Sequence, residues 1–248
     1  MDLNNIFMLD CREGIKLLPC SFINLVVVSP PYNLGNIGIK HKIEYSLYKD
    51  NKEFKDYISF LEEVFSLLFN KMAEDGRVCI NIGDQKNGEI PTHFFITEMM
   101  LRIGYKVFTT IIWNKSQVSN RTSWGSWLSP SCPSFPTPFE YILIFYKNER
   151  KLIHKGVSDL VREEFINWSL ALWSFAPETR MKKFAHPAMF PEELPKRLIK
   201  LLSYPQDIVL DPFAGVGTTL KVAKDLNRKY IGFEIDEKYY NTALERLK

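Results

Sequence analysis

The chain has 248 residues, of which 46% are hydrophobic, and its formal net charge at pH 7 is +3. This apolar content excludes an intrinsically disordered chain and suits one large α/β domain or two small ones. The small positive charge permits a nucleic-acid partner without indicating one. No apolar run is long enough to span a bilayer, and no basic segment precedes an apolar one at the start, so we expect a cytoplasmic protein with no membrane partner.

The first part of the chain alternates short apolar runs with segments of helical spacing. In chain order, these patterns predict a strand over residues 5–10, a short helix over 11–18, a buried strand over 23–28, a helix over 57–72, a turn at 74–77 and a buried strand over 77–83. This alternation is typical of an α/β sheet.

The strand over residues 23–28 ends abruptly in the sequence SPPY, which is Ser29 to Tyr32. The two prolines lack backbone N–H groups and have a fixed φ, so neither can continue a central strand. The result is a stiff turn that carries a hydroxyl group and an aromatic ring. It is either a simple strand-ending turn or part of a site.

The middle of the chain differs in composition from its flanks. A helix is predicted over residues 91–103, strands over 106–115 and 140–147, and a further helix over 190–204. All five tryptophans lie between residues 113 and 173, within a stretch that is also rich in proline and serine. This shift indicates a specialised surface, although some of the tryptophans could belong to the core.

The four cysteines form no C-x-x-C pair, and no histidine lies at ligand spacing from them. We therefore expect reduced, mostly structural thiols and no metal site.

Residues 207–236 have the pattern of a strand, a glycine turn, a helix and a second strand, which is a βαβ unit. Gly215 and Gly217 open the helix, so a ligand can approach the backbone closely at a helix N-terminus. Glu234 ends the second strand, where a carboxylate can accept both hydroxyls of a ribose. Leu220 replaces the third glycine of G-x-G-x-x-G, which favours a nucleoside cofactor without phosphates. A packing turn beside a solvated glutamate is the alternative.

Together, SPPY after an apolar strand and DPFAGVGTT late in the chain resemble the motifs of S-adenosylmethionine-dependent DNA amino-methyltransferases. The order, with the catalytic motif first, is similar to the circularly permuted β group. The resemblance covers nearly the whole chain and implies one catalytic domain over residues 1–248. The implied fold is a Rossmann-like α/β fold with a seven-stranded, mostly parallel, permuted sheet.

The resemblance also implies two strand pairings. The strand over residues 5–10 would lie beside the strand that ends at Glu234, and the strand over 23–28 beside the one that ends at Asp211. The diproline and glycine turns would then be neighbours at the carboxyl edge, where open sheets bind ligands.

The catalytic residues expected from the first motif are Ser29, Pro30, Pro31 and Tyr32. An exocyclic amine is a poor nucleophile, because its lone pair is delocalised into the ring of the base. Hydrogen bonds to Ser29 and to the Pro30 carbonyl, which Pro31 helps to hold in place, would restore that lone pair. Tyr32 would stack on an extruded base.

The cofactor implied by the resemblance is S-adenosyl-L-methionine. Asp211 would meet its cationic amino group and Asp10 its adenine amine. Each of three residues also has a structural alternative to cofactor binding. Asp211 could be a cap-like residue, Asp10 an ordinary strand-end aspartate, and Phe190 a hydrophobic staple at a helix start. The expected cofactor-binding residues are Asp10, Phe190, Asp211, Phe213, Gly215, Gly217, Thr218 and Glu234.

The resemblance implies site-specific methylation of double-stranded DNA by base flipping. A serine before P-P-Y is common in enzymes that act on N4 of cytosine, whereas aspartate or asparagine is usual for N6 of adenine. Ser29 therefore favours cytosine N4; adenine N6, an RNA base or a protein amide stays open.

Residues 116–185 are the expected target-recognition insertion, with Arg121, Arg162 and Arg180 as candidates for contacts to phosphates or guanines. Analogy with the family further suggests a restriction-modification system with a cognate endonuclease, a homodimer, and a location near the nucleoid of a bacterial or archaeal cell.

Overall fold

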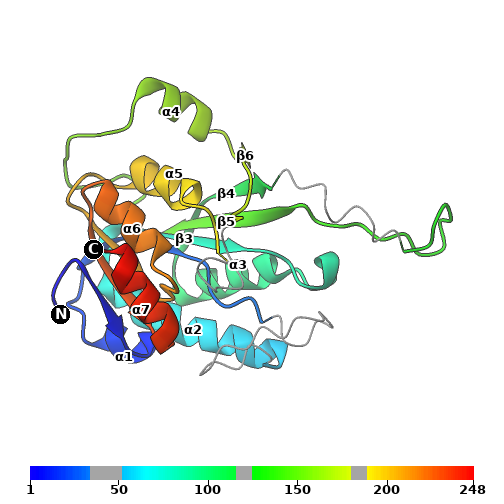
Figure 1. Ribbon diagram of the computed structural model, residues 1–248, viewed down its shortest axis with the longest axis horizontal. Helices are drawn as coiled ribbons and strands as arrows, with labels where there is room; N and C mark the ends of the chain where they lie inside the picture. Colours follow the sequence, from blue (N-terminus) through cyan, green and yellow to red (C-terminus); the bar gives the residue numbers. More distant parts are fainter. Residues whose placement is uncertain (34–51, 116–124, 180–188) are drawn as a thin grey trace.

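The computed structural model describes residues 1–33, 52–115, 125–179 and 189–248 (Figure 1). Within these ranges, eight strands form one sheet in the order β1-β8-β7-β2-β3-β5-β4-β6. The strands are β1 (Asn5–Met8), β2 (Ile23–Val28), β3 (Met72–Ile82), β4 (Lys106–Asn114), β5 (Phe139–Tyr146), β6 (Leu172–Ser174), β7 (Ile208–Asp211) and β8 (Lys229–Glu234).

Helices cover both faces of the sheet (Figure 1). Helices α1, α2 and α3 pack on one face, and α5, α6 and α7 pack on the other, where α4 joins them through Trp168. None of the helices in the described ranges is both long and apolar enough to cross a membrane. The helices are α1 (Cys11–Lys16), α2 (Phe54–Lys71), α3 (Thr92–Ile103), α4 (Arg162–Trp168), α5 (Glu193–Leu202), α6 (Thr218–Asp225) and α7 (Glu237–Arg246), with a 3₁₀ turn over Lys86–Gly88.

Strand β2 shows why its sequence is a continuous apolar run. Val26 and Val28 pack against the α1–α3 side, whereas Leu25 and Val27 pack against the α5–α7 side. Because successive side chains of a strand point to opposite faces, a strand covered on both faces needs apolar residues at every position.

The sheet confirms the α/β class and both strand pairings expected from the sequence. β1 pairs in parallel with β8, and β2 pairs in parallel with β7. Among the described strands, only β5 runs antiparallel to its neighbours; the other paired strands are parallel. The C-terminal ends of all these strands except β5 therefore lie along one edge, here called the carboxyl edge, and the opposite edge is the amino edge.

The expectation of seven strands was wrong, because the described sheet has eight. The additional strand is β6, which pairs in parallel with β4 so that Trp113 and Trp173 face each other. Its three residues lie in the irregular stretch and are too few to show a period of two along the sequence.

The expected turn at residues 74–77 was also wrong, because these residues lie within β3. Ile23 is paired with Met72 and Leu25 with Arg77, so residues 73–76 form a bulge opposite a single residue of β2. A Cβ atom at Gly76 would lie 2.9 Å from the Ala73 carbonyl oxygen, which explains the glycine that suggested a turn.

The tryptophans are mainly core residues. Trp113, Trp168 and Trp173 are buried, whereas Trp127 is 64% exposed. Trp124 lies outside the described residues. The concentration of tryptophan therefore marks the packing of β4, α4 and β6 as well as a surface.

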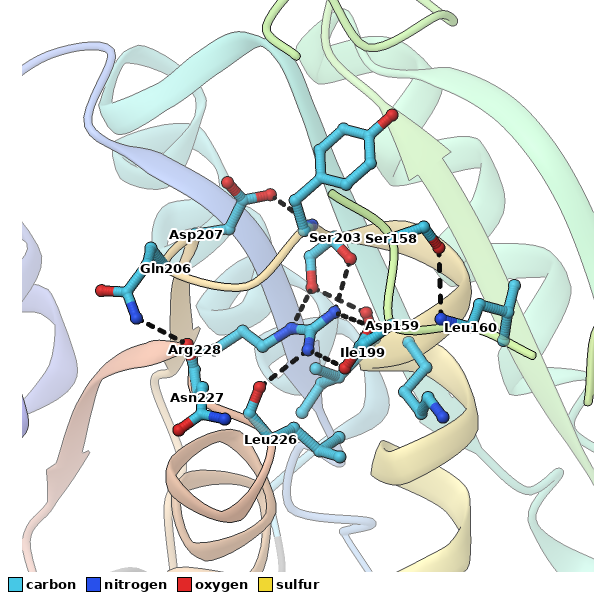
Figure 2. A network of polar contacts seen from close by, with 12 residues as sticks. Ser158, Asp159, Leu160, Ile199, Ser203, Gln206, Asp207, Leu226, Asn227 and Arg228 are labelled. Carbon is cyan, nitrogen blue, oxygen red and sulfur yellow. Dashed lines mark hydrogen bonds and ion pairs between the residues drawn. The ribbon is translucent and has the colours of Figure 1, made fainter. Parts of the chain in front are cut away.

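A polar network at the amino edge fastens the segment that follows β5 (Figure 2). The buried Arg228 guanidinium donates to Asp159 at 2.9 Å and to the Ser203 carbonyl at 2.7 Å. His154 bridges Asp75 and Asp207, with both ring nitrogens 3.0 Å from a carboxylate oxygen. Because Arg228 and Asp207 immediately precede β8 and β7, this network connects the segment after β5 to the end of the sheet opposite the carboxyl edge.

Candidate active site

The glycine turn connects the end of β7 to the start of α6. Gly215 and Gly217 have φ values of +51° and +75°, in the left-handed region where glycine avoids steric cost. A Cβ atom at Gly217 would lie 3.0 Å from the Cβ of Ala243 in α7. The positive φ accounts for both glycines, and the close approach of α7 is a second reason for glycine at position 217.

Leu220 stands where a dinucleotide-binding motif has its third glycine, and the structure shows how the fold accommodates it. In β8, a Cβ atom at Gly232 would lie 2.4 Å from Leu220 Cδ1. The glycine that allows close packing of helix and strand is therefore on the strand. Leu220 does not disrupt the βαβ unit.

The Glu234 carboxylate accepts a hydrogen bond from the glycine turn. The Gly215 N–H donates to Glu234 Oε2 at 2.7 Å, and Oε1 accepts from the Ile235 and Asp236 N–H groups at 2.9 and 2.8 Å. Burial raises the pKa of Glu234 although these N–H groups favour its charged form. The carboxylate is thus held at the end of β8 by backbone donors.

Asp211 ends β7 and is 3% exposed. Its Oδ1 accepts from the Phe213 N–H at 3.0 Å. Burial raises the pKa of Asp211 to about 7, against the hydrogen bonds from Thr219 and Phe213, and the nearby Glu234 adds to the increase. Two carboxylates beside the turn disfavour a phosphate and favour a ligand that brings a cation and hydroxyl donors.

The diproline turn lies beside the glycine turn, because β2 and β7 are neighbours. Thr219 Oγ1, in the first turn of α6, lies 3.3 Å from the Val27 carbonyl oxygen, so this residue connects the two strand ends. Pro30 is buried, whereas Ser29 and Pro31 are partly exposed. Gln85 donates to the Tyr32 carbonyl at 3.1 Å and holds the turn against the residues that follow β3.

Behind the diproline turn, the structure adds three residues that were not predicted: Asn81, Lys115 and Glu140. The Tyr32 hydroxyl donates to Glu140 Oε2 at 3.1 Å, and Lys115 forms an ion pair with Glu140 Oε1. Burial and the neighbouring Glu140 carboxylate raise the pKa of Tyr32 well above its ordinary value, so the phenol remains a donor.

These three residues had a weak signal in the sequence. Glu140 is the charged residue in the apolar run FEYILIFY, and Asn81 is the polar one in VCINI. A polar side chain inside a strand that is covered on both faces needs a partner. This rule can flag such residues, but it cannot name the partner.

Asp10 caps α1 and lies near Glu234. Its carboxylate accepts from the Arg12 N–H at 2.8 Å and forms an ion pair with the Arg12 guanidinium at 2.8 Å. The hydrogen bond from Arg12 lowers the pKa of Asp10 although burial opposes this. The Leu9 N–H donates to the Glu234 carbonyl at 3.0 Å, so Asp10 is at the same sheet edge as the glycine turn.

The remaining expected cofactor residues lie around the same turn or pack on the helices behind it. Phe213 is partly buried, with its ring centroid 5.9 Å from that of Phe60 in α2. Thr218 begins α6, and its Oγ1 accepts from Arg246 at 3.0 Å. Phe190 is partly buried against the core beneath α5, α6 and α7.

Of the expected DNA-binding residues, Arg162 is exposed at the first position of α4. Arg121 and Arg180 lie outside the described residues. Residues 125–138 project beyond the sheet (Figure 1). They continue from the carboxyl edge, where the Lys115 N–H donates to the Pro138 carbonyl at 2.9 Å.

Comparisons with known proteins agree with this geometry. The family model N6_N4_Mtase, described as DNA methylase, matches residues 23–245. The Type II methyltransferase M.MjaVI of Methanocaldococcus jannaschii is 38% identical over 165 residues, which cover 66% of this chain and 81% of the relative. M.MjaI, a Type II methyltransferase of the same organism, is 32% identical over 247 residues, which cover 87% of this chain and 82% of that relative.

Solved structures share the whole fold. TTHA0409 of Thermus thermophilus, described as a DNA modification methylase, aligns with a TM-score of 0.76 and 27% identity over 98% of this chain and 93% of its own. A second structure of it is complexed with S-adenosyl-L-methionine. PvuII DNA methyltransferase (cytosine-N4-specific) has the same fold, with a TM-score of 0.72 and 23% identity over 98% and 85% of the two chains. With both motifs at one sheet edge and a family match over residues 23–245, this chain belongs to the N6/N4 DNA methylase family.

Proposed function

We propose that this chain transfers a methyl group from S-adenosyl-L-methionine to the N4 amine of cytosine in duplex DNA. The observation that carries the proposal is the Ser29 hydroxyl at the end of β2, beside the glycine turn. Its hydrogen is directed to Tyr32 at 2.9 Å or to the Asn81 carbonyl at 3.3 Å. Its oxygen can therefore accept a hydrogen bond from an amine. By the family resemblance, serine at this position favours cytosine N4 over adenine N6 as the methylated amine.

The residues around the glycine turn fit S-adenosyl-L-methionine, which when bound supplies a methyl group on a sulfonium centre. This molecule carries an ammonium group and two ribose hydroxyls but no phosphate. Asp211 would hold the ammonium group, Glu234 the hydroxyls, and Gly215 and Gly217 allow close approach. Asp10, Phe190, Phe213 and Thr218 complete the proposed site.

The diproline turn prepares the target amine for attack. Ser29 Oγ and the Pro30 carbonyl accept the two amino hydrogens, which returns the lone pair to the nitrogen. The fixed φ of Pro31 keeps that carbonyl in place. Tyr32 stacks on the extruded base, so the chain contributes mainly orientation and electrostatics.

Recognition of the target sequence is proposed for residues 116–185. The described part of this region includes a projecting segment that begins at the carboxyl edge and exposes Trp127, Leu128 and Phe135. Because M.MjaVI and M.MjaI are named Type II methyltransferases, we place the chain in a restriction-modification system with a partner endonuclease.

The role of Asp211 predicts how cofactor affinity depends on pH. Its pKa is raised to about 7, so the carboxylate is largely neutral below that value and charged above it. Affinity for the cationic cofactor should therefore rise with pH through this range, by up to about tenfold per unit below the pKa. Calorimetry from about pH 5.5 to about pH 7 would measure it, below the range in which an α-amino group loses its proton. Asp211→Asn should bind weakly with a flat profile; a rise that persists in this variant would assign the titration to another group.

Nucleoside mass spectrometry tests the target base. Unmethylated plasmid DNA is incubated with the enzyme and the cofactor and then digested to nucleosides. The expected product is N4-methylcytosine. N6-methyladenine as the sole product would overturn the choice of cytosine but not the assignment of the two turns. Without any methylated nucleoside, duplex DNA would be the wrong substrate.

A further inference from the structure

Glu140 is an unusual residue in its strand. Its side chain is 9% exposed and lies in β5, directly before Tyr141 and the apolar residues that follow it. Three donors from separate parts of the chain surround it. Asn81 donates to Oε2 at 2.7 Å, Tyr32 donates to the same oxygen at 3.1 Å, and Lys115 pairs with Oε1.

The hydrogens in this cluster can be assigned individually. The Asn81 amide has two hydrogens, directed to Glu140 and, at 2.9 Å, to the Tyr32 hydroxyl oxygen. The single Tyr32 hydrogen goes to Glu140, because an ionised carboxylate can only accept. The Tyr32 oxygen is thus an acceptor toward Ser29, whose hydroxyl lies 2.9 Å away.

This assignment gives the chain of hydrogen bonds one direction, from Ser29 through Tyr32 to Glu140. The Ser29 hydrogen points to the protein, toward Tyr32 or the Asn81 carbonyl, and its lone pairs are left for the target amine. The Lys115 ammonium group pairs with the other carboxylate oxygen, Oε1, and so leaves Oε2 to accept from Tyr32 and Asn81. The direction therefore depends on a carboxylate that does not reach the substrate itself.

We propose that Glu140 is a positioning residue that, through the Tyr32 hydroxyl, holds the Ser29 hydroxyl as a hydrogen-bond acceptor for the target amine. This inference rests on the proposed role of Ser29 in the reaction. A glutamine at position 140 has nearly the same shape but can donate from its amide. Tyr32 could then donate to Ser29, and the Ser29 hydrogen would turn toward the substrate, where it opposes an N–H donor.

A double-mutant cycle tests the proposal. The variants are Glu140→Gln, Tyr32→Phe, which keeps the ring but breaks the chain, and the two combined. Each single variant should lower kcat about tenfold, with unchanged cofactor affinity and little change in KM for DNA. The double variant should be no slower than Tyr32→Phe alone, because Glu140 acts through the phenol. A purely structural role would instead lower thermal stability and give effects that multiply.

Glu74→Gln is the matched control. Glu74 also lies on the sheet and pairs with a lysine, Lys147, but it is at the amino edge. Its replacement should leave kcat unchanged. If the wild-type enzyme methylates DNA, a wild-type kcat in Glu140→Gln, or multiplicative effects in the double variant, would overturn the inference but not the proposed function. If Glu140→Gln does not fold, Tyr32→Phe alone tests the proposal. A wild-type kcat in Tyr32→Phe would show that the chain of hydrogen bonds through the Tyr32 hydroxyl does not contribute to the reaction. A wild-type enzyme inactive on DNA would overturn the proposed function as well.

Discussion

Gly215→Asp is expected to reduce affinity for S-adenosyl-L-methionine on the order of a hundredfold or more. Gly215 has φ +51°, which strains any residue with a Cβ atom. Its N–H holds Glu234 Oε2 at 2.7 Å, so the new carboxylate would lie close to an existing one. Isothermal titration calorimetry on the folded variant measures the loss, with thermal unfolding to show that the domain is intact.

Gly88→Asp is the control for this substitution. Gly88 also has a positive φ, +95°, and an added Cβ atom meets nothing within 4 Å. This variant introduces the same side chain and a similar backbone strain away from the glycine turn, and its affinity for the cofactor should equal that of the wild type. Undiminished affinity in Gly215→Asp would remove the glycine turn from the cofactor site.

The turns could be predicted from the sequence because their chemistry is local. Two consecutive prolines end a strand wherever they occur, and Gly215 and Gly217 have the positive φ values for which glycine is suited. The pairing of β2 with β7 joins segments at opposite ends of the chain. Hydrophobic periodicity does not indicate which strands pair, so the correct pairing of β2 with β7 came from the family resemblance.

The elements that were missed depend on contacts that are distant in the sequence. β6 has three residues and is a strand because β4 offers an open edge beside it. The bulge of β3 needs a glycine at position 76, because a Cβ atom there would lie 2.9 Å from the Ala73 carbonyl oxygen. In the sequence, the same glycine resembles a turn residue.

The site was incomplete at the sequence level for the same reason. Tyr32 and Glu140 are 108 positions apart and meet because β2, β3 and β5 are consecutive in the sheet. A buried glutamate in an apolar strand indicates that a partner exists. Only the strand order identifies the partner as the tyrosine of the diproline turn.

Tyr32→Ala is expected to lower turnover on duplex DNA on the order of a hundredfold or more, because stacking of a base on an aromatic ring contributes roughly 1–3 kcal/mol in addition to the effect of the hydroxyl. The substitution also removes the hydroxyl that accepts from Ser29 at 2.9 Å. Cofactor affinity should be unchanged, since neither interaction involves the glycine turn. Steady-state methyl transfer and calorimetry measure the two effects separately.

Tyr32→Phe distinguishes the contribution of the ring to turnover from that of the hydroxyl. It should retain the stacking surface and be faster than Tyr32→Ala, and the difference in kcat between the two variants reports the contribution of the ring. A fluorescent base analogue at the target position should show less extrusion in Tyr32→Ala only. Because Tyr32 also packs against the core beneath α2, thermal unfolding must show that the alanine variant remains folded. Wild-type turnover in a folded Tyr32→Ala would exclude this residue from the active site.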